Sequence, residues 1–208
     1  MGYGYRDDNS DYLYHWIKNT RRWKDTENAY DDAFVSMESI IEDQFIYSGE
    51  AMGLTRNSCI SFTESVKSEI IRDRSLYQPF GFEFRKIDIH NLGGRTAIYS
   101  PSEEKAELGE KHQWRHVKFD LNDTSNGKEK GHDFTWEREW RLNSSRLSLL
   151  ECTGIYVPNS YYKNKVRAIL KGIISLDAYE NSLNNGVCYH SKDTDEFCSF
   201  IAERVHIL

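Results

Sequence analysis

The stretch DFTWEREWRL, residues 133–142, places two glutamates, two arginines and two tryptophans almost side by side. Its aromatic residues alternate with other types, which favours a β-strand, and successive side chains of a strand point to opposite faces. As a strand, one face would carry Phe134, Trp136, Arg138, Trp140 and Leu142, and the other Thr135, Glu137, Glu139 and Arg141. We therefore expect the two glutamates to lie about 7 Å apart on one face, with both tryptophans buried on the other. In the alternative, a helix, Trp136 would pair with Trp140 and Glu137 with Arg141.

Two carboxylates on one face of a strand have two interpretations. They can belong to a solvated surface with a salt bridge to Arg141. They can also form a catalytic pair, in which a carboxylate binds a ribose hydroxyl and stabilises an oxocarbenium-like cation. Arg141 would then either balance the charge of Glu139 or bind a phosphate of a dinucleotide, and we favour the balancing role.

The rest of the chain predicts an α+β fold with several antiparallel strands and a few helices. We expect strands at 12–17, 57–65 and 81–89, and within 95–101, 114–121 and 147–159. Helices are predicted from the spacing of apolar residues within 33–44, 102–113 and 160–173, with Asp31 or Asp32 capping the first and Ser160 the last. The segment 197–208 fits a strand or a helix. We expect one domain over residues 1–208, with 1–11 flexible and a loop at 122–133.

The composition is that of an ordinary globular protein. Charged residues make up 29% of the chain, and its net charge of −6 argues against a general nucleic-acid coat. We find no apolar run near the ~18 residues of a membrane span and no secretory leader, and we expect a cytoplasmic protein without a membrane partner. None of the four cysteines forms a CxxC pair, and Cys59 and Cys152 are interpreted as buried free thiols.

Two other segments offer side chains that fit the catalytic interpretation. His15 lies between aromatic residues on the first predicted strand, where a core histidine is the simpler explanation. The run SFTES, residues 61–65, ends a predicted strand in hydroxyls and a carboxylate, although Thr63 or Ser65 could instead cap a following helix. His112, His116 and His132 have no metal-site spacing, so we predict no metal.

The order of these segments resembles a known family. The pattern is similar to that of the AbiGi-type bacterial proteins of abortive infection and phage resistance. It consists of YHW on an early strand, then IIEDQFIYSGEA, CISFTES, FGFEFRK and RTAIYS, and finally EREWRL before an apolar strand. More distantly, the pattern resembles the ADP-ribosyltransferase fold. That resemblance implies NAD as substrate, with His15, Ser61 and Thr63 as NAD-binding residues and Glu137 and Glu139 as the catalytic pair. We place Arg141 with the NAD-binding residues as well.

Two classes of function follow from this reading. The first is an ADP-ribosyltransferase or NAD glycohydrolase of antiphage defence, acting on a macromolecular acceptor, protein or nucleic acid, beside a partner protein of a defence system. The second is a non-catalytic interaction protein, an antitoxin or a sensor, on the same fold. A small basic cluster, Arg21, Arg22 and Lys24 beside Trp23, fits a solvated loop better than a contact with nucleic acid.

Overall fold

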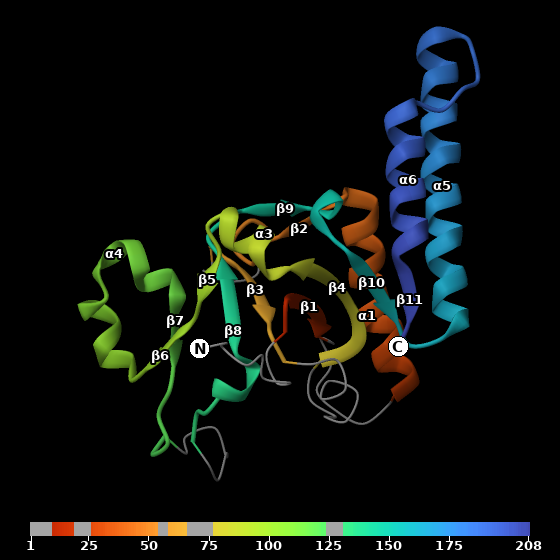
Figure 1. Cartoon of the computed structure of the whole chain (residues 1–208). Helices are drawn as coiled ribbons and strands as arrows, with labels where there is room; N and C mark the ends of the chain where they lie inside the picture. The colour runs from red at the N-terminus through yellow and green to blue at the C-terminus, as the bar shows by residue number, and fades with distance from the viewer. Residues whose placement is uncertain (1–9, 19–25, 54–57, 66–76, 124–130) are drawn as a thin grey trace, which may run out of the picture. The chain divides into compact units, whose positions relative to one another are not determined.

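A computed structural model describes residues 10–18, 26–53, 58–65, 77–123 and 131–208 (Figure 1). Its helices and mainly antiparallel strands confirm the predicted α+β class. The chain divides into two compact units. Unit 1 comprises Met1–His15, Tyr47–Glu69 and Phe84–Leu147, and unit 2 comprises Trp16–Ile46, Ile70–Glu83 and Ser148–Leu208. The single domain expected over 1–208 stays a prediction.

Unit 1 is built from short strands that pair side by side. Its elements are β3 (Ile60–Thr63), α3 (Lys86–Asn91), β5 (Arg95–Thr96), β6 (Ile98–Ser100), the 3-10 turns η1 (Ser102–Glu107) and η2 (Gln113–Arg115), α4 (Gly109–His112), β7 (His116–Lys118), η3 (Thr135–Glu137) and β8 (Glu139–Leu142), together with the start of β1 (Tyr12–Lys18). β3 pairs antiparallel with both β1 and β8, and β5 pairs antiparallel with β8. β6 and β7 form a separate parallel pair.

The apolar residues of these strands form the core of unit 1. Leu13, Phe62 and Phe84 are buried, and the rings of Phe62 and Phe84 meet edge to face with their centroids 5.5 Å apart. Such edge-to-face contacts are favoured by the charge distribution of aromatic rings, so the pair stabilises the packing of β3 in this core.

Unit 2 packs helices against a smaller group of strands. Its elements are α1 (Thr26–Asp43), η4 (Leu149–Glu151), β10 (Gly154–Val157), α5 (Ser160–Asn185), α6 (Lys192–Arg204) and β11 (Val205–Ile207), while β2 (Phe45–Tyr47), β4 (Tyr77–Arg85) and β9 (Arg146–Ser148) have residues in both units. β10 pairs antiparallel with β4 and parallel with β11. Only glycine fits at position 81 of β4, because a Cβ there would lie 2.4 Å from the ring of Trp16.

Helices α5 and α6 lie side by side along most of their length (Figure 1). The predicted apolar face of α5 is confirmed, since Tyr162, Val166, Ile169 and Leu170 are buried. From residue 171 to residue 196 no side chain is buried. This outer part of the hairpin is held instead by polar contacts such as that of the Asp177 carboxylate with the backbone N–H of Ser191.

Several predicted boundaries are wrong. α1 already begins at Thr26, so Asp31 and Asp32 lie inside it rather than capping it. Asn159, not Ser160, caps α5, because its side chain accepts hydrogen bonds from two backbone N–H groups of the first turn.

The strand predicted at 81–89 ends at Arg85, where helix α3 starts. The segment 197–208 contains both a helix end and a strand. The cluster of Arg21, Arg22 and Lys24, and most of the loop at 122–133, lie outside the described residues.

Candidate functional site

Three neighbouring strands of unit 1 carry most of the residues singled out in the sequence. His15 lies on β1, Ser61 and Thr63 on β3, and Glu139 and Arg141 on β8. Thr63 is opposite Glu139 in the antiparallel register, and Ser61 is opposite Arg141. Since residues opposite each other in a ladder share a face of the sheet, these four side chains lie together on one side of β3 and β8.

His15 lies on the other side of these strands. Tyr14 is the residue opposite Thr63, so the neighbouring His15 shares its face with Phe62. A ring contact with centroids 6.2 Å apart agrees with that placement. The Nδ1 atom of His15 lies 2.9 Å from the carbonyl oxygen of Ser61 and donates to it, which places a proton on Nδ1. The structure therefore brings His15 to the backbone of β3 but not to the face of Glu139.

The carboxylate of Glu139 is buried and held by Arg141. Arg141 donates from Nε to Oε1 at 2.8 Å and from Nη2 to Oε2 at 3.4 Å. The same guanidinium donates through Nη1 to the carbonyl oxygens of Trp114, at 3.0 Å, and His116, at 2.7 Å. The side chains of Glu139 and Arg141 are only 10% and 14% exposed. This geometry supports the charge-balancing role that we favoured for Arg141.

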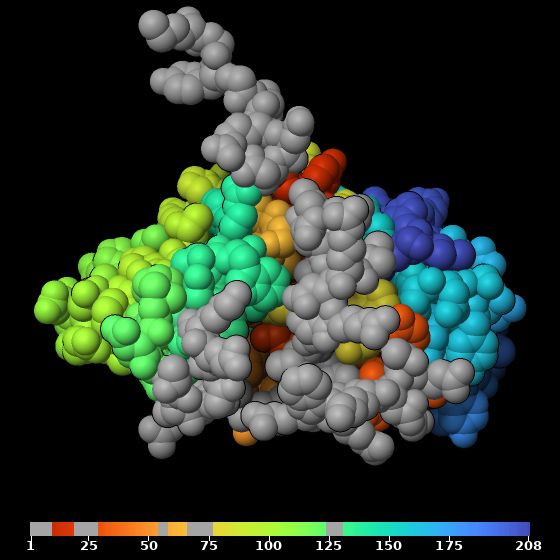
Figure 2. Space-filling model, turned by 90° about the horizontal axis from the view of Figure 1, so that it is seen from below, coloured from red at the N-terminus to blue at the C-terminus, as the bar shows by residue number. Residues whose placement is uncertain are grey.

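Tyr99 completes the surroundings of Glu139. The backbone N–H of Glu139 donates to the Tyr99 hydroxyl at 2.9 Å. Burial raises the pKa of Tyr99 to about 12, with the nearby Glu139 carboxylate acting in the same direction. The segments 98–120 and 131–142 lie against each other on the surface of unit 1, in green and blue-green in Figure 2. One side of the predicted site is thus covered by the segment around Trp114 and His116, whose carbonyl oxygens accept hydrogen bonds from Arg141.

The prediction of one long strand over 134–142 is wrong. Only residues 139–142 are extended, while 135–137 form a 3-10 turn and Arg138 has a left-handed backbone with a φ of 45°. Two hydroxyls account for this path, because Thr63 donates to the carbonyl oxygen of Glu137 and Ser65 to that of Trp136, at 2.7 Å. These bonds take up carbonyl groups that a longer ladder would use.

The turn changes where the charged and aromatic side chains of this stretch lie. Glu137 is not on the strand that carries Glu139, so the alternation that predicted a 7 Å carboxylate pair does not apply. Trp136 is 44% exposed rather than buried. Trp140, on β8, is half-buried rather than buried as predicted, whereas Glu139 on the opposite face is buried.

The carboxylate of the SFTES run is Glu64, for which the sequence predicted no role. Its buried carboxylate accepts hydrogen bonds from Lys86 at 2.7 Å, from Arg138 at 3.1 Å and from the indole N–H of Trp140 at 3.1 Å. Its position directly after SFT, at the end of a strand, is the sequence signal from which a role for this residue could have been predicted. A buried carboxylate needs such donors, and this one ties the end of β3 to β8 and α3.

A groove of about 560 Å³ lies beside this cluster in unit 1. Asp11, Tyr12, Arg85, Lys86, Ile87, His90 and Trp140 line it. Its two basic side chains are already paired, Arg85 with Asp88 and Lys86 with Glu64, and Asp11 adds a carboxylate to the lining. Glu139 is not among the lining residues of this groove, and its carboxylate is already engaged by Arg141.

Comparisons with known proteins give one likeness to report. No family model matches the chain, and no curated protein matches it. Among solved structures, the Thermus sp. 2.9 DarT in complex with NAD+ is similar over 81% of this chain and 91% of that chain, with 12% identity and a TM-score of 0.43. None of the described helices is long and apolar enough to cross a membrane.

Proposed function

We propose that the chain is a NAD-dependent ADP-ribosyltransferase, which acts as a NAD glycohydrolase when water takes the place of the acceptor. The observation that carries the proposal is the buried carboxylate of Glu139, fixed by Arg141 and opposite Thr63 in the register of β3 and β8. An acid held in one orientation by two hydrogen bonds needs no reorganisation to stabilise a cation.

The proposed reaction breaks the bond between the nicotinamide nitrogen and the ribose. Its electron pair leaves with nicotinamide, and the ribose carbon becomes an oxocarbenium-like cation. Glu139 accepts a hydrogen bond from the ribose 2′-hydroxyl and stabilises this charge, as carboxylates do in glycoside cleavage. A nucleophile of the acceptor then bonds to the ribose carbon and loses its proton.

The other site residues have supporting roles in the proposal. Ser61 and Thr63 hold the strand beside Glu139, and Thr63 also fixes the backbone of Glu137. Glu137 orients the acceptor, a protein or a nucleic acid. His15 binds the adenosine-side ribose, and Arg141 keeps Glu139 in place. We further propose a role in bacterial antiphage defence beside a partner protein, which rests on the resemblance of EREWRL and its companion segments to the AbiGi-type proteins.

A second function is favoured by a specific observation. His15 and Glu139 face opposite sides of β3, and Arg141 already engages the Glu139 carboxylate. A non-catalytic interaction protein, an antitoxin or sensor, needs no convergence of these residues. Such a protein would consume no NAD.

Labelled NAD and a cell extract distinguish the two functions. We expect the full-length chain to release nicotinamide and to transfer label to a macromolecule. Glu139→Gln should lose both reactions, while Glu137→Gln should keep NAD hydrolysis and lose transfer. Glu104→Gln, an exposed residue of η1, is the control and should keep both. The proposal fails if Glu139→Gln, folded by circular dichroism, retains full turnover.

His15→Ala tests the NAD contact separately. The proposed contact predicts a raised KM for NAD with kcat little changed, whereas a core histidine predicts lower stability and an unchanged KM. The defence role is tested by challenging cells that express the wild type or Glu139→Gln with phages. Equal protection in both strains would mean that the defence role does not depend on NAD chemistry.

A further inference from the structure

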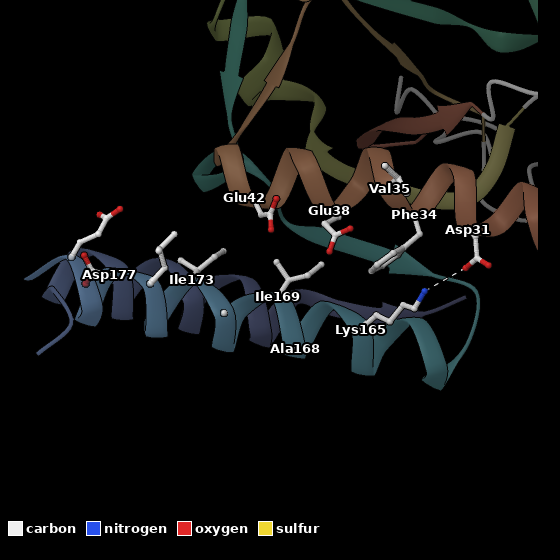
Figure 3. Close-up of a pocket in the computed structure, with 13 residues that line it drawn as sticks. Asp31, Phe34, Val35, Glu38, Glu42, Lys165, Ala168, Ile169, Ile173 and Asp177 are labelled. Atoms are coloured by element: carbon white, nitrogen blue, oxygen red, sulfur yellow. Dashed lines mark hydrogen bonds and ion pairs between the residues drawn. The ribbon is translucent and has the colours of Figure 1, made fainter. Parts of the chain in front are cut away.

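A second groove, of about 910 Å³, lies between α1 and α5 in unit 2 (Figure 3). On α5 the groove follows one stripe of the helix, from Lys165 to Glu180, at the spacing of a single helical face. That stripe is about 22 Å long, which is the length of a helix of about 15 residues. The groove is therefore long enough to bind one further helix.

The floor of the groove is apolar and open to solvent. Val35 on α1 is 62% exposed and Leu176 on α5 is 59% exposed, and Ile169 and Ile173 lie between them along the same groove. Contiguous apolar surface of this kind on a protein marks a binding site more often than isolated exposed residues do.

The rim of the groove is strongly acidic. The described lining contains five carboxylates, Asp31, Glu38, Glu42, Asp177 and Glu180. Lys165 is the one cation among these lining residues, and it is already engaged, 3.4 Å from Asp31 and over the ring of Phe34. In the described part of the chain no ion pair involves Glu38, Glu42 or Glu180. Asp31 and Asp177 are also engaged, and Glu38, Glu42 and Glu180 remain as acidic groups beside the apolar floor.

Gly172 lies in the middle of the α5 stripe and faces this open space. A Cβ added there would meet no atom within 4 Å, so the packing of the chain itself does not require glycine. Glycine is unfavourable inside a helix, yet it lets another backbone approach closely. This position agrees with a second helix lying across α5.

We propose that this groove is the docking site for an amphipathic helix of a different protein, one with apolar residues on one face and lysines or arginines on the other. Charge complementarity identifies the occupant, because basic side chains on either edge of such a helix would meet the carboxylates of α1 and α5. A second copy of this chain would bring the same acidic rim to a symmetric contact, and like charges would oppose it. The proposal is independent of the NAD chemistry.

The test uses the full chain and a synthetic helical peptide of about 15 residues with leucines on one face and lysines on the other. Fluorescence anisotropy should show binding of this peptide and none of the matched peptide with glutamates in place of lysines. Glu38→Lys combined with Glu42→Lys should weaken binding by about tenfold or more. The control, Glu103→Lys combined with Glu104→Lys on η1, changes the net charge equally and should bind like the wild type.

Gly172→Trp fills the groove without changing its charge and should also weaken binding by about tenfold or more. Glu42 and Gly172 are exposed and Glu38 is half-buried, and circular dichroism tests whether both groove variants fold. The proposal is overturned if the lysine peptide does not bind, if the control variant loses as much affinity as the groove variant, or if Gly172→Trp binds normally. It is also overturned if sedimentation shows a dimer of the wild type that Gly172→Trp dissociates, since the occupant is then a second copy.

Discussion

Arg141 and Glu139, two positions apart on β8, hold each other through two hydrogen bonds, of 2.8 Å and 3.4 Å. The two remaining bonds of Arg141, to the carbonyl oxygens of Trp114 and His116, reach a segment far away in the sequence. One guanidinium therefore both neutralises the buried carboxylate and connects β8 to the segment around η2 and β7.

Replacing Arg141 with leucine is expected to destabilise the protein by about 3–5 kcal/mol, because it leaves a buried carboxylate without its counter-charge. Denaturant unfolding measures this change. Arg167→Leu, at an exposed position of α5, is the control and should change the unfolding free energy by less than about 0.5 kcal/mol. An Arg141→Leu protein as stable as the wild type would mean that Glu139 is solvated.

The two tryptophans of the WEREW stretch, residues 136–140, should respond differently to substitution. Trp140→Phe is expected to cost about 1–3 kcal/mol, since it removes a hydrogen-bond donor from the buried Glu64 carboxylate. Trp136→Phe at the exposed neighbouring position should cost less than about 0.5 kcal/mol. Equal losses in denaturant unfolding would contradict the described path of residues 135–142.

Alkaline pH should destabilise the fold through Tyr99. Burial raises the pKa of Tyr99 from 10.0 to about 12, so the folded state holds this proton more tightly than the unfolded state. The resulting stability is complete below pH 10 and is lost as the pH rises from 10 to 12, by up to about 2 kcal/mol.

Denaturant midpoints measured from pH 9 to pH 12 test this dependence, with Tyr99→Phe as the matched variant. Tyr99→Phe should lose part of the decline but not all of it, because burial also raises the pKa of Tyr162. A decline of unchanged size in Tyr99→Phe would show that the Tyr99 hydroxyl is solvated in the fold.

The four cysteines should separate into one reactive thiol and three protected ones. Cys188 is exposed, whereas Cys59, Cys152 and Cys198 are buried, and burial raises the pKa of each of these three. A thiol reagent at pH 8 should label Cys188 rapidly and the others only after unfolding. Mass spectrometry of the labelled peptides, with Cys188→Ser as control, gives the result. Fast labelling of Cys152 in the native protein would contradict the described core.

The sequence could predict the elements whose apolar spacing is long and regular. The face of α5 that carries Tyr162 and Val166 and the burial of Cys59 and Cys152 followed from local pattern alone. The ion pair of Glu139 and Arg141 could also be predicted, because residues two apart on a strand share a face.

The rest depends on contacts that no local pattern encodes. The strand breaks before Glu139 because hydroxyls of Thr63 and Ser65 bind carbonyl groups more than seventy positions later, which determines the exposure of Trp136. The role of Glu64 likewise needs three donors from two distant segments. The opposite facing of His15 and Glu139 follows from the register of β1, β3 and β8, and the sequence does not specify that register.

The hairpin of α5 and α6 divides into two parts with different burial. Around Val166 and Ile201 its side chains are buried, but none is buried between residues 171 and 196. A region without buried apolar side chains opens at a lower free energy than the core. Backbone amide protons of the outer turns should therefore exchange with deuterium through a local opening, long before those near Val166, which wait for unfolding of the whole unit.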